Sequence, residues 1–288
     1  MTRSSTRSDT ETHLSYPRLL TIAGSDSGGG AGIQADLKTF AALGCYGMSA
    51  ITAITAQNTC GVRAIAPLAP SILAAQIDAV AEDIGVDAVK IGMLHDPETV
   101  RTVAAALRRH RFAHVVLDPV MVATSGDALM ARETVAVLVA ELFPLAAVIT
   151  PNLHEAALLL GRPVAQEADM EAAAADLLAL GAQAVLLKGG HLPGERMVDL
   201  LAQAGAKPQA MVSARIPSAN THGTGCTLSS ALACHLALGA SLDDAAQRAK
   251  VYVHAAIAAG ADVRIGQGHG PLNHGYAPVA MRKVERHS

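Results

Sequence analysis

Asn220-Thr221-His222-Gly223-Thr224-Gly225-Cys226-Thr227 is the stretch that decides both the fold and the chemistry of this chain. It stands directly before an apolar run, Leu228 to Leu238, which predicts a loop opening into a helix. Glycine lets a backbone approach a ligand closely. The first N–H groups of a helix have no partner inside the helix and carry partial positive charge. The stretch therefore predicts an anion site, most often a phosphate site.

Cys226 falls in the first turn of this predicted helix, where the pKa of a thiol is lowered. We therefore expect a reactive thiol beside the anion. Cys234, eight residues further along the same helix, is expected to pack in the core. No two of the four cysteines form a C-x-x-C pair, and the histidines show no ligand spacing, so no zinc site is predicted. Free thiols and an N-terminus without an apolar segment indicate the reducing cytoplasm.

The composition bounds the class of protein. The chain has 288 residues, of which 51% are hydrophobic and 16% charged, as in globular proteins. A net charge of -3 and an aromatic content of 2% argue against nucleic acid as a partner. The most apolar stretch, Thr134 to Thr150, is short and is broken by Glu141 and Pro144, so no membrane span is expected.

Short apolar runs alternate with longer Ala-rich periodic segments. Strands are predicted at Leu19–Ala23, Met48–Thr55, Ala88–Ile91, Val115–Leu117, Ala147–Ile149, Ala184–Leu187, Arg196–Ala202 and Ala210–Ile216. Helices are predicted at Gln34–Leu43, Ser71–Ile84, Glu98–Arg109, Arg132–Leu142, Leu153–Leu160, Met170–Leu180, Thr227–Leu238 and Leu242–Ala259. This order predicts an α/β fold with a mainly parallel sheet covered on both faces, and the last two strands predict a small antiparallel ribbon at its edge. Residues 1–18 are expected to be a disordered tail and residues 19–288 a single domain.

In such sheets, ligands bind at the carboxyl ends of the strands. Polar residues follow several predicted strands, and these are Ser25 and Asp26, Gln57 and Asn58, Asp118, Thr150 with Asn152, and Lys188. We expect them to meet at one rim of the sheet.

Each of these features also has a structural interpretation. Asn152 and Glu155 match a capping box at a helix start. Asp118 precedes a proline and suits a turn, Lys188 could be a solvated loop lysine, and His222 could lie on the surface. The glycine-rich segment Gly24–Gly32 contains a weak dinucleotide pattern, but no acidic residue ends the next strand and no P-loop lysine follows the glycines.

Taken together, the motifs resemble one family, the hydroxymethylpyrimidine/phosphomethylpyrimidine kinases of thiamine biosynthesis. The motifs are Leu20–Asp26 with Gly28–Gly32, Gln34–Thr39, Thr52–Cys60, Lys90–Leu94, Asp118–Met121, Thr150–Leu153, Lys188–His191 and Asn220–Thr227. The resemblance implies a ribokinase-like, three-layer α/β/α fold. It also implies ATP-dependent phosphorylation of 4-amino-5-hydroxymethyl-2-methylpyrimidine and then of its monophosphate.

The resemblance also implies roles for individual residues. Gln57, aided by Gly24, Asp36, Thr55 and Met93, would hold the pyrimidine. ATP would be held by Lys188, Asn152, Asn220, Thr221 and His222, and its Mg²⁺ by Asp118 and Glu155. Asn220 to Cys226 would form the anion hole, in which Gly223, Thr224, Gly225 and Cys226 are the catalytic residues. From the mechanism of phosphoryl transfer, we expect Cys226 to take the proton of the substrate hydroxyl.

One departure concerns the segment after Met121, where many relatives carry a flap lysine and this chain has Thr124-Ser125-Gly126. Without an inserted lid, the substrate rim could be completed by a second subunit, so a homodimer is expected. Three alternatives stay open: a pyridoxal kinase on the same scaffold, a NAD-dependent oxidoreductase and a non-catalytic pyrimidine sensor.

Overall fold

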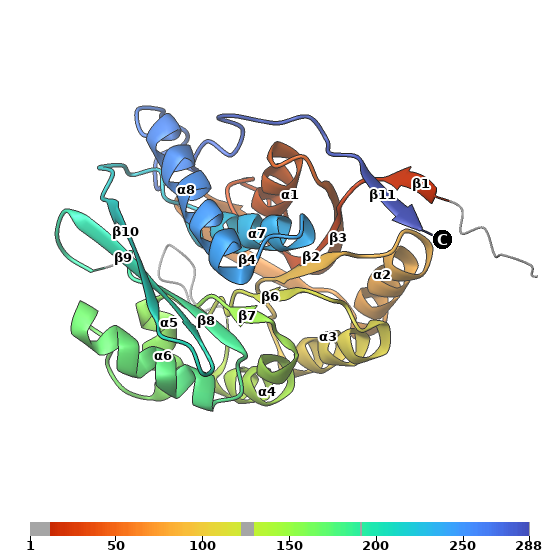
Figure 1. Cartoon of the computed structure of the whole chain (residues 1–288), viewed down its shortest axis with the longest axis horizontal. Helices are drawn as coiled ribbons and strands as arrows, with labels where there is room; N and C mark the ends of the chain where they lie inside the picture. Colours follow the sequence, from red (N-terminus) through yellow and green to blue (C-terminus); the bar gives the residue numbers. More distant parts are fainter. Residues whose placement is uncertain (1–11, 122–129, 191, 288) are drawn as a thin grey trace, which may run out of the picture.

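A nine-stranded sheet runs through the middle of the molecule, between two layers of helices (Figure 1). The computed structural model describes residues 12–121, 130–190 and 192–287. The sheet contains β2 (Arg18–Asp26), β3 (Tyr46–Asn58), β4 (Gly61–Pro67), β5 (Ala88–Ile91), β6 (Val115–Leu117), β7 (Val148–Ile149), β8 (Ala184–Lys188), β9 (Arg196–Gln203) and β10 (Gln209–Ala214). Their order across the sheet is β10-β9-β8-β7-β6-β5-β2-β3-β4.

The strands from β8 to β3 are parallel, whereas β4, β9 and β10 join the two edges in antiparallel register. This confirms the predicted α/β class and the antiparallel ribbon β9–β10. The strand β4 was not predicted. That strand is half exposed along its length and directly follows β3, so it lacks the continuous apolar run by which the buried strands were recognised.

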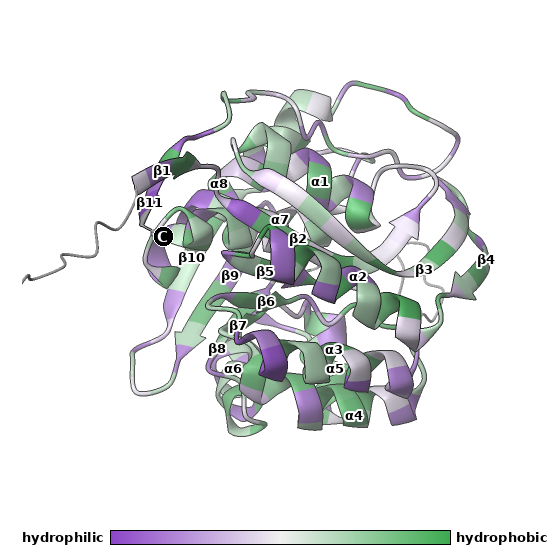
Figure 2. Cartoon of the chain, turned by 90° about the vertical axis from the view of Figure 1, so that its right-hand side faces the viewer, coloured by the Kyte–Doolittle hydropathy of each residue, from purple (hydrophilic) through white to green (hydrophobic). Residues whose placement is uncertain are grey.

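Eight α-helices cover the sheet in the described residues. They are α1 (Gly32–Ala42), α2 (Pro70–Asp83), α3 (Pro97–His110), α4 (Arg132–Leu142), α5 (Leu153–Leu160), α6 (Met170–Ala179), α7 (Thr224–Ala237) and α8 (Leu242–Gly260). The helices α2 to α6 pack on one face of the sheet, and α1, α7 and α8 pack on the other. The predicted three-layer arrangement is therefore confirmed. On the outer helices the hydrophobic and hydrophilic residues alternate, as expected where one face is buried (Figure 2).

Alternation along the strands sends successive side chains to opposite cores. In β8, for example, Leu186 joins the core beneath α7 and α8, whereas Leu187 joins the core on the side of α2 to α6. The same period of two decides which side chains reach the active-site rim, as described below.

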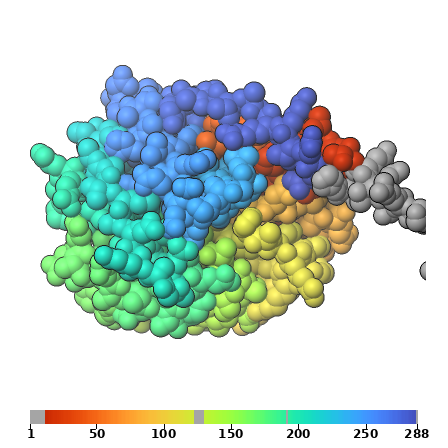
Figure 3. Space-filling view, in the orientation of Figure 1, coloured from red at the N-terminus to blue at the C-terminus, as the bar shows by residue number. Residues whose placement is uncertain are grey.

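The N-terminal segment corrects one prediction. Thr12–Ser15 form a strand, β1, which pairs in antiparallel register with β11 (Val284–His287). Arg18 begins β2 and forms an ion pair with Asp87 at 2.8 Å. The expected tail therefore does not extend to residue 18, because the C-terminal strand gives residues 12–15 a backbone partner; residues 1–11 lie outside the described part. The C-terminal residues lie beside this N-terminal strand on the surface (Figure 3).

Candidate active site

A cavity of about 880 Å³ lies at the carboxyl ends of the parallel strands. The strand β2 has β3 as its neighbour on one side and β5 on the other, and the cavity lies at the ends of these strands. Open α/β sheets bind ligands at such a point, where the strand order reverses. Its wall includes the loop after β2, the ends of β5, β6 and β8, and the first turn of α7. Most of the polar residues predicted at the rim line this one cavity, whereas Asn58 and Thr150 do not.

Five polar residues line up beneath this cavity on one face of the sheet. Thr21, Lys90, Asp118, Thr150 and Lys188 each stand two positions after an apolar residue of the core under α7 and α8. Because side chains two apart on a strand share a face, all five belong to the face that carries α7. The backbone of these strands therefore brings together groups that are far apart in the sequence.

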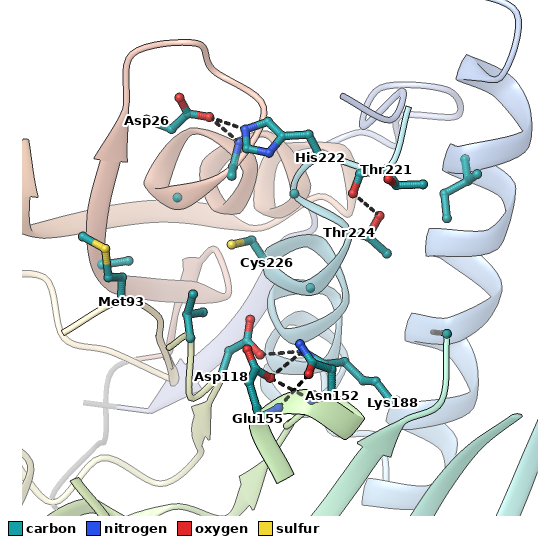
Figure 4. A pocket seen from close by; sticks show the side chains of 18 of the residues that line it. Asp26, Met93, Asp118, Asn152, Glu155, Lys188, Thr221, His222, Thr224 and Cys226 are labelled. Carbon is teal, nitrogen blue, oxygen red and sulfur yellow. Dashed lines mark hydrogen bonds and ion pairs between the residues drawn. The ribbon is translucent and has the colours of Figure 1, made fainter. Parts of the chain in front are cut away.

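Lys188, Asp118 and Glu155 form the charged end of the cavity (Figure 4). The Lys188 Nζ lies 2.8 Å from Asp118 Oδ1 and 3.9 Å from Glu155 Oε2. Thr150 Oγ1 also donates to Asp118 Oδ1, at 2.9 Å. Lys188 is thus a paired, mostly buried cation, and the alternative of a solvated loop lysine is wrong.

The two carboxylates of this end differ in protonation. Burial raises the pKa of Glu155 to about 7, although Lys188 opposes the rise. Burial also acts to raise the pKa of Asp118, but Lys188 and Lys90 outweigh it and leave that pKa below the ordinary value. A buried glutamate with a raised pKa gains from a further cation. Two adjacent carboxylates with a nucleotide phosphate suit Mg²⁺, so the donor set fits the expected ion.

Glu155 also closes the predicted capping box of α5. Its Oε2 accepts from the backbone N–H of Asn152 at 2.7 Å, and Asn152 Oδ1 accepts from the backbone N–H of Glu155 at 2.9 Å. Both residues line the cavity as well. Asn152 and Glu155 therefore form a helix cap and also line the cavity. The cap fixes the orientation of the Glu155 carboxylate.

The predicted anion loop leads into α7, which begins at Thr224. Gly223 is the N-cap, in the left-handed region at φ 84°. A Cβ on Gly223 would lie 1.9 Å from the carbonyl oxygen of Gly30, so this loop and the loop after β2 touch backbone to backbone. Only glycine permits both the conformation and the contact. The N–H groups of Gly225 and Cys226 belong to the first turn of α7 and have no partner inside the helix.

A buried pair ties the same two loops together. The Nε2 of His222 lies 2.9 Å from Asp26 Oδ2, and both residues are almost fully buried. Asp26 also accepts from the backbone N–H groups of Gly28, Gly30 and Ala31. The alternative that His222 lies on the surface is therefore wrong. Asp26 lines the cavity as well, although no individual role had been predicted for it.

Cys226 lies between the charged end and the Asp26–His222 pair (Figure 4). The prediction of a lowered thiol pKa is wrong. Burial raises the pKa of Cys226 to about 11, even though the Lys90 ammonium and the Gly32 N–H act in the opposite direction. In the first turn of a helix the dipole favours a thiolate, but removal from water costs more at this position.

The other end of the cavity is lined mainly by uncharged residues. Gln57 lines it beside a bulge between Ala56 and Gln57, a feature that changes the direction of a side chain on a strand. Gln57 Oε1 accepts from Thr55 Oγ1 at 3.2 Å. A Cβ on Gly24 would lie 2.6 Å from the Met93 side chain. Glycine at position 24 therefore leaves the space that the Met93 side chain occupies in this wall. The structure brings together these four predicted residues.

Two predicted residues stay outside the cavity wall. Asp36 is fully buried beneath it and accepts from Thr21 and Ser230. Asn220 donates its amide to the carbonyl oxygens of Gly260 and Val263, which fixes the loop to the end of α8. Lys90, which lines the cavity, was missed as a site residue. A lysine within the apolar strand Ala88–Ile91 was the signal that could have found it. The expected flap at Thr124-Ser125-Gly126 lies outside the described residues.

Comparison with known proteins fits this geometry. Residues 26–273 match the family model described as phosphomethylpyrimidine kinase. The chain belongs to the phosphomethylpyrimidine kinase family. It is 56% identical over 256 residues to the hydroxymethylpyrimidine/phosphomethylpyrimidine kinase of Rhizobium meliloti, which covers 88% of this chain and 96% of the relative.

Solved structures of relatives agree with the fold. A phosphomethylpyrimidine kinase from Clostridium difficile superposes with a TM-score of 0.73 and 46% identity, over 83% of this chain and 99% of the other. An ADP complex of Bacillus subtilis pyridoxal kinase gives 0.84 and 40% identity, over 90% and 98%. The family resemblance and the ribokinase-like fold inferred from the motifs are thus confirmed, and nucleotide binding is supported. In the part of the chain that is described, no helix has the length and apolarity to cross a membrane.

Proposed function

We propose that this phosphomethylpyrimidine kinase family member transfers the γ-phosphoryl group of ATP to the hydroxymethyl group of 4-amino-5-hydroxymethyl-2-methylpyrimidine, and then to the resulting monophosphate. One observation carries the proposal: a cation, two carboxylates and the first turn of α7 meet at one end of a cavity whose other end presents an amide, Gln57. An amide offers both a donor and an acceptor, which suits an aminopyrimidine edge.

Phosphoryl transfer depends on position and charge stabilisation more than on covalent chemistry by the protein. Lys188 and the N–H groups at the start of α7 would bind the transferring oxygens. Asp118 and Glu155 would hold Mg²⁺, which neutralises phosphate charge when bound. Asn152, Thr221 and His222 would border the nucleotide, and the wall near Arg215 and Ile257 leaves room for its base.

Cys226 would accept the proton of the substrate hydroxyl in the first transfer. A phosphate monoester is already anionic near neutral pH, with a second pKa of about 6, so the second transfer needs little help from a base. We therefore expect Cys226→Ala to slow the first transfer about 100-fold, within the usual range for general base catalysis, and the second much less.

The deciding experiment is a kinase assay with each of the two pyrimidines, read by product mass. Cys234→Ala is the matched control, because it removes a thiol from the same helix at a fully buried position. Equal losses of kcat for both acceptors in Cys226→Ala, with the fold intact, would exclude the proposed base. Absence of either phosphorylated product with the unaltered chain would exclude the function.

A pyridoxal kinase is the second candidate, because the superposition on the Bacillus subtilis pyridoxal kinase reaches a TM-score of 0.84. Gln57 and Met93 favour the pyrimidine. Competition between pyridoxal and the hydroxymethylpyrimidine, with ATP consumption as the readout, separates the two.

We also propose a homodimer in the cytoplasm. The half-exposed edge strand β4 and the exposed side chain of Ile54 lie near the pyrimidine end, where a second subunit would complete the rim. The free cysteines of the described residues suit a reducing compartment. Light scattering across a range of protein concentrations tests the dimer, and a monomer at all concentrations would contradict it.

A further inference from the structure

Lys90 is an unusual residue for a central strand. It lies in the middle of the sheet on β5, and its side chain is fully buried. Its Nζ is 2.9 Å from both oxygens of Asp36, which is also fully buried. Lysine and aspartate are almost never fully buried unless they are paired, and replacing such a pair with apolar residues is often neutral or stabilising. The pair is therefore hard to explain by stability alone.

Both carboxylate oxygens of Asp36 accept a further hydrogen bond. Thr21 Oγ1 donates to Asp36 Oδ2 at 2.6 Å, and Ser230 Oγ donates to Asp36 Oδ1 at 2.7 Å. Thr21 is the direct neighbour of Lys90 across β2 and β5. The carboxylate is therefore fixed by three elements, and it holds the ammonium group at one place in the floor of the cavity.

Cys226 lies on the helix whose Ser230 binds this pair. It is four residues before Ser230 on α7, and residues four apart lie one above the other on a helix. Since Ser230 binds Asp36, the side chain one turn nearer the cavity is placed at the ammonium end of the pair. Both Cys226 and Lys90 line the cavity. A buried cation thus sits beneath the sulfur that borders the anion loop.

We propose that Lys90, oriented by Asp36, is the positioning residue that supports negative charge on the Cys226 sulfur during the first phosphoryl transfer. This inference rests on the proposed function. The thiol proton first leaves to water. The thiolate then takes the proton of the substrate hydroxyl: the O–H bond breaks and an S–H bond forms. The freed oxygen pair forms a bond to the γ-phosphorus, and the bond from that phosphorus to ADP breaks with its electrons remaining on ADP.

The electrostatics agree in sign. The charged groups around the sulfur are Lys90 on β5, Asp36 on α1, Asp118 after β6 and Lys188 on β8. Burial raises the pKa of Cys226 to about 11, Lys90 lowers it, and the two aspartates raise it. Reciprocally, Asp36 and Cys226 raise the pKa of Lys90 against its own burial. Lys90 therefore stays protonated beneath the thiol at neutral pH.

Two substitutions of opposite sign test the charge directly. Alkylation by iodoacetamide is followed against pH in a Cys60→Ser background, because Cys60 is exposed whereas Cys45 and Cys234 are buried. Asp36→Asn removes an anion and keeps a similar shape, so we expect the rate at pH 8 to rise about tenfold. Lys90→Met combined with Asp36→Asn removes the cation without leaving an unpaired carboxylate, so we expect the rate to fall about tenfold below that of Asp36→Asn alone. Mere loosening of the core would speed alkylation in both variants and would overturn the proposal.

The kinetic arm separates this inference from the proposed function. We expect the double variant to lower kcat for the hydroxymethylpyrimidine at least tenfold and for the monophosphate less than twofold, with no further loss when Cys226→Ala is added.

With the unaltered chain, the first transfer should quicken from pH 7 to 9 and the second should not. Equal losses for both acceptors, or losses that add to that of Cys226→Ala, overturn the role of Lys90. A chain that phosphorylates neither pyrimidine instead contradicts the proposed function, and the alkylation profiles still decide whether Lys90 acts on the sulfur.

Discussion

The two ends of the cavity are built in different ways. At the charged end, Lys188, Asp118 and Glu155 act through side chains that project from the ends of neighbouring strands and the first turn of α5. At the loop end, the wall depends on backbone contact between Gly30 and Gly223, which are distant in the sequence. The first end provides charged groups. The second depends on a close backbone contact, which a side-chain atom on either glycine would disturb.

This difference has a consequence for tolerance to change. A side chain of the charged end can be removed without moving the strand that carries it, so catalysis should fail before folding does. At the loop end the backbones of Gly30 and Gly223 touch each other, so a substitution there should affect folding and catalysis together. Substitutions at each end therefore test the contrast.

The largest effect is expected for Lys188→Ala. Removal of the cation that we propose to face the transferring phosphoryl group should lower kcat about 10²–10³-fold, the usual loss when one group that stabilises the transition state is deleted. The fold should survive, because the strand partners of β8 remain. Steady-state kinetics and circular dichroism measure the two quantities. Lys207→Ala, at an exposed turn, is the control, and a loss of less than twofold in Lys188→Ala would contradict the assignment.

Gly223→Ala is the next test, and it addresses the loop end. Gly239, at the other end of α7, has nearly the same backbone conformation, with φ 82° against 84°, but a Cβ there would meet nothing within 4 Å. Gly239→Ala should therefore cost only the conformational strain, about 1 kcal/mol of unfolding free energy. Gly223→Ala adds a collision with Gly30 and should cost about 3 kcal/mol and most of the activity. Urea unfolding of both variants measures the difference, and equal midpoints would show that the loops do not interlock.

Asp26→Asn weakens the pair that fastens the same loops. Burial acts to raise the pKa of Asp26, but His222 and the N–H groups of Ala31 and Gly28 outweigh it, so the pKa in the folded state is lowered. A lowered pKa contributes stability above the unfolded value of about 3.9, and this stability is lost as the pH falls through the folded value.

At pH 7 the variant should be about 2 kcal/mol less stable, the range for a hydrogen bond to a charged group. The gap to the unaltered chain should then narrow as the pH falls below about 4. Thermal unfolding from pH 7 to pH 3 measures it, with Asp83→Asn at an exposed position as the control. A gap that stays constant with pH would mean that the carboxylate charge does not hold the loops.

The same contrast explains what the sequence could predict. The charged end was predictable residue by residue, because Asp118 directly follows one strand and Lys188 ends another, and parallel strands bring their carboxyl ends to one rim. The contact of Gly30 with Gly223 and the pairing of Asp26 with His222 depend on how α1 and α7 pack side by side, which no local pattern encodes. For Cys226 the local rule on helix ends was correct in sign, but burial by the surrounding elements was larger.

Gln57→Ala should have the smallest effect and distinguishes the two ends by substrate. Loss of an amide contact to the pyrimidine is worth about 1.4 kcal/mol, which is a tenfold rise in KM for the pyrimidine. The KM for ATP should not change, because Gln57 lies at the end away from Lys188 and Asp118. Gln57→Glu keeps an acceptor and loses the donor, so it shows which half of the amide is used, and Gln203→Ala on β9 is the control because its side chain bonds Asp243 instead. Initial rates with each substrate varied in turn decide the matter. If the KM for ATP rises and that for the pyrimidine does not, the nucleotide occupies the end with Gln57, and the two substrates exchange their assigned places in the cavity.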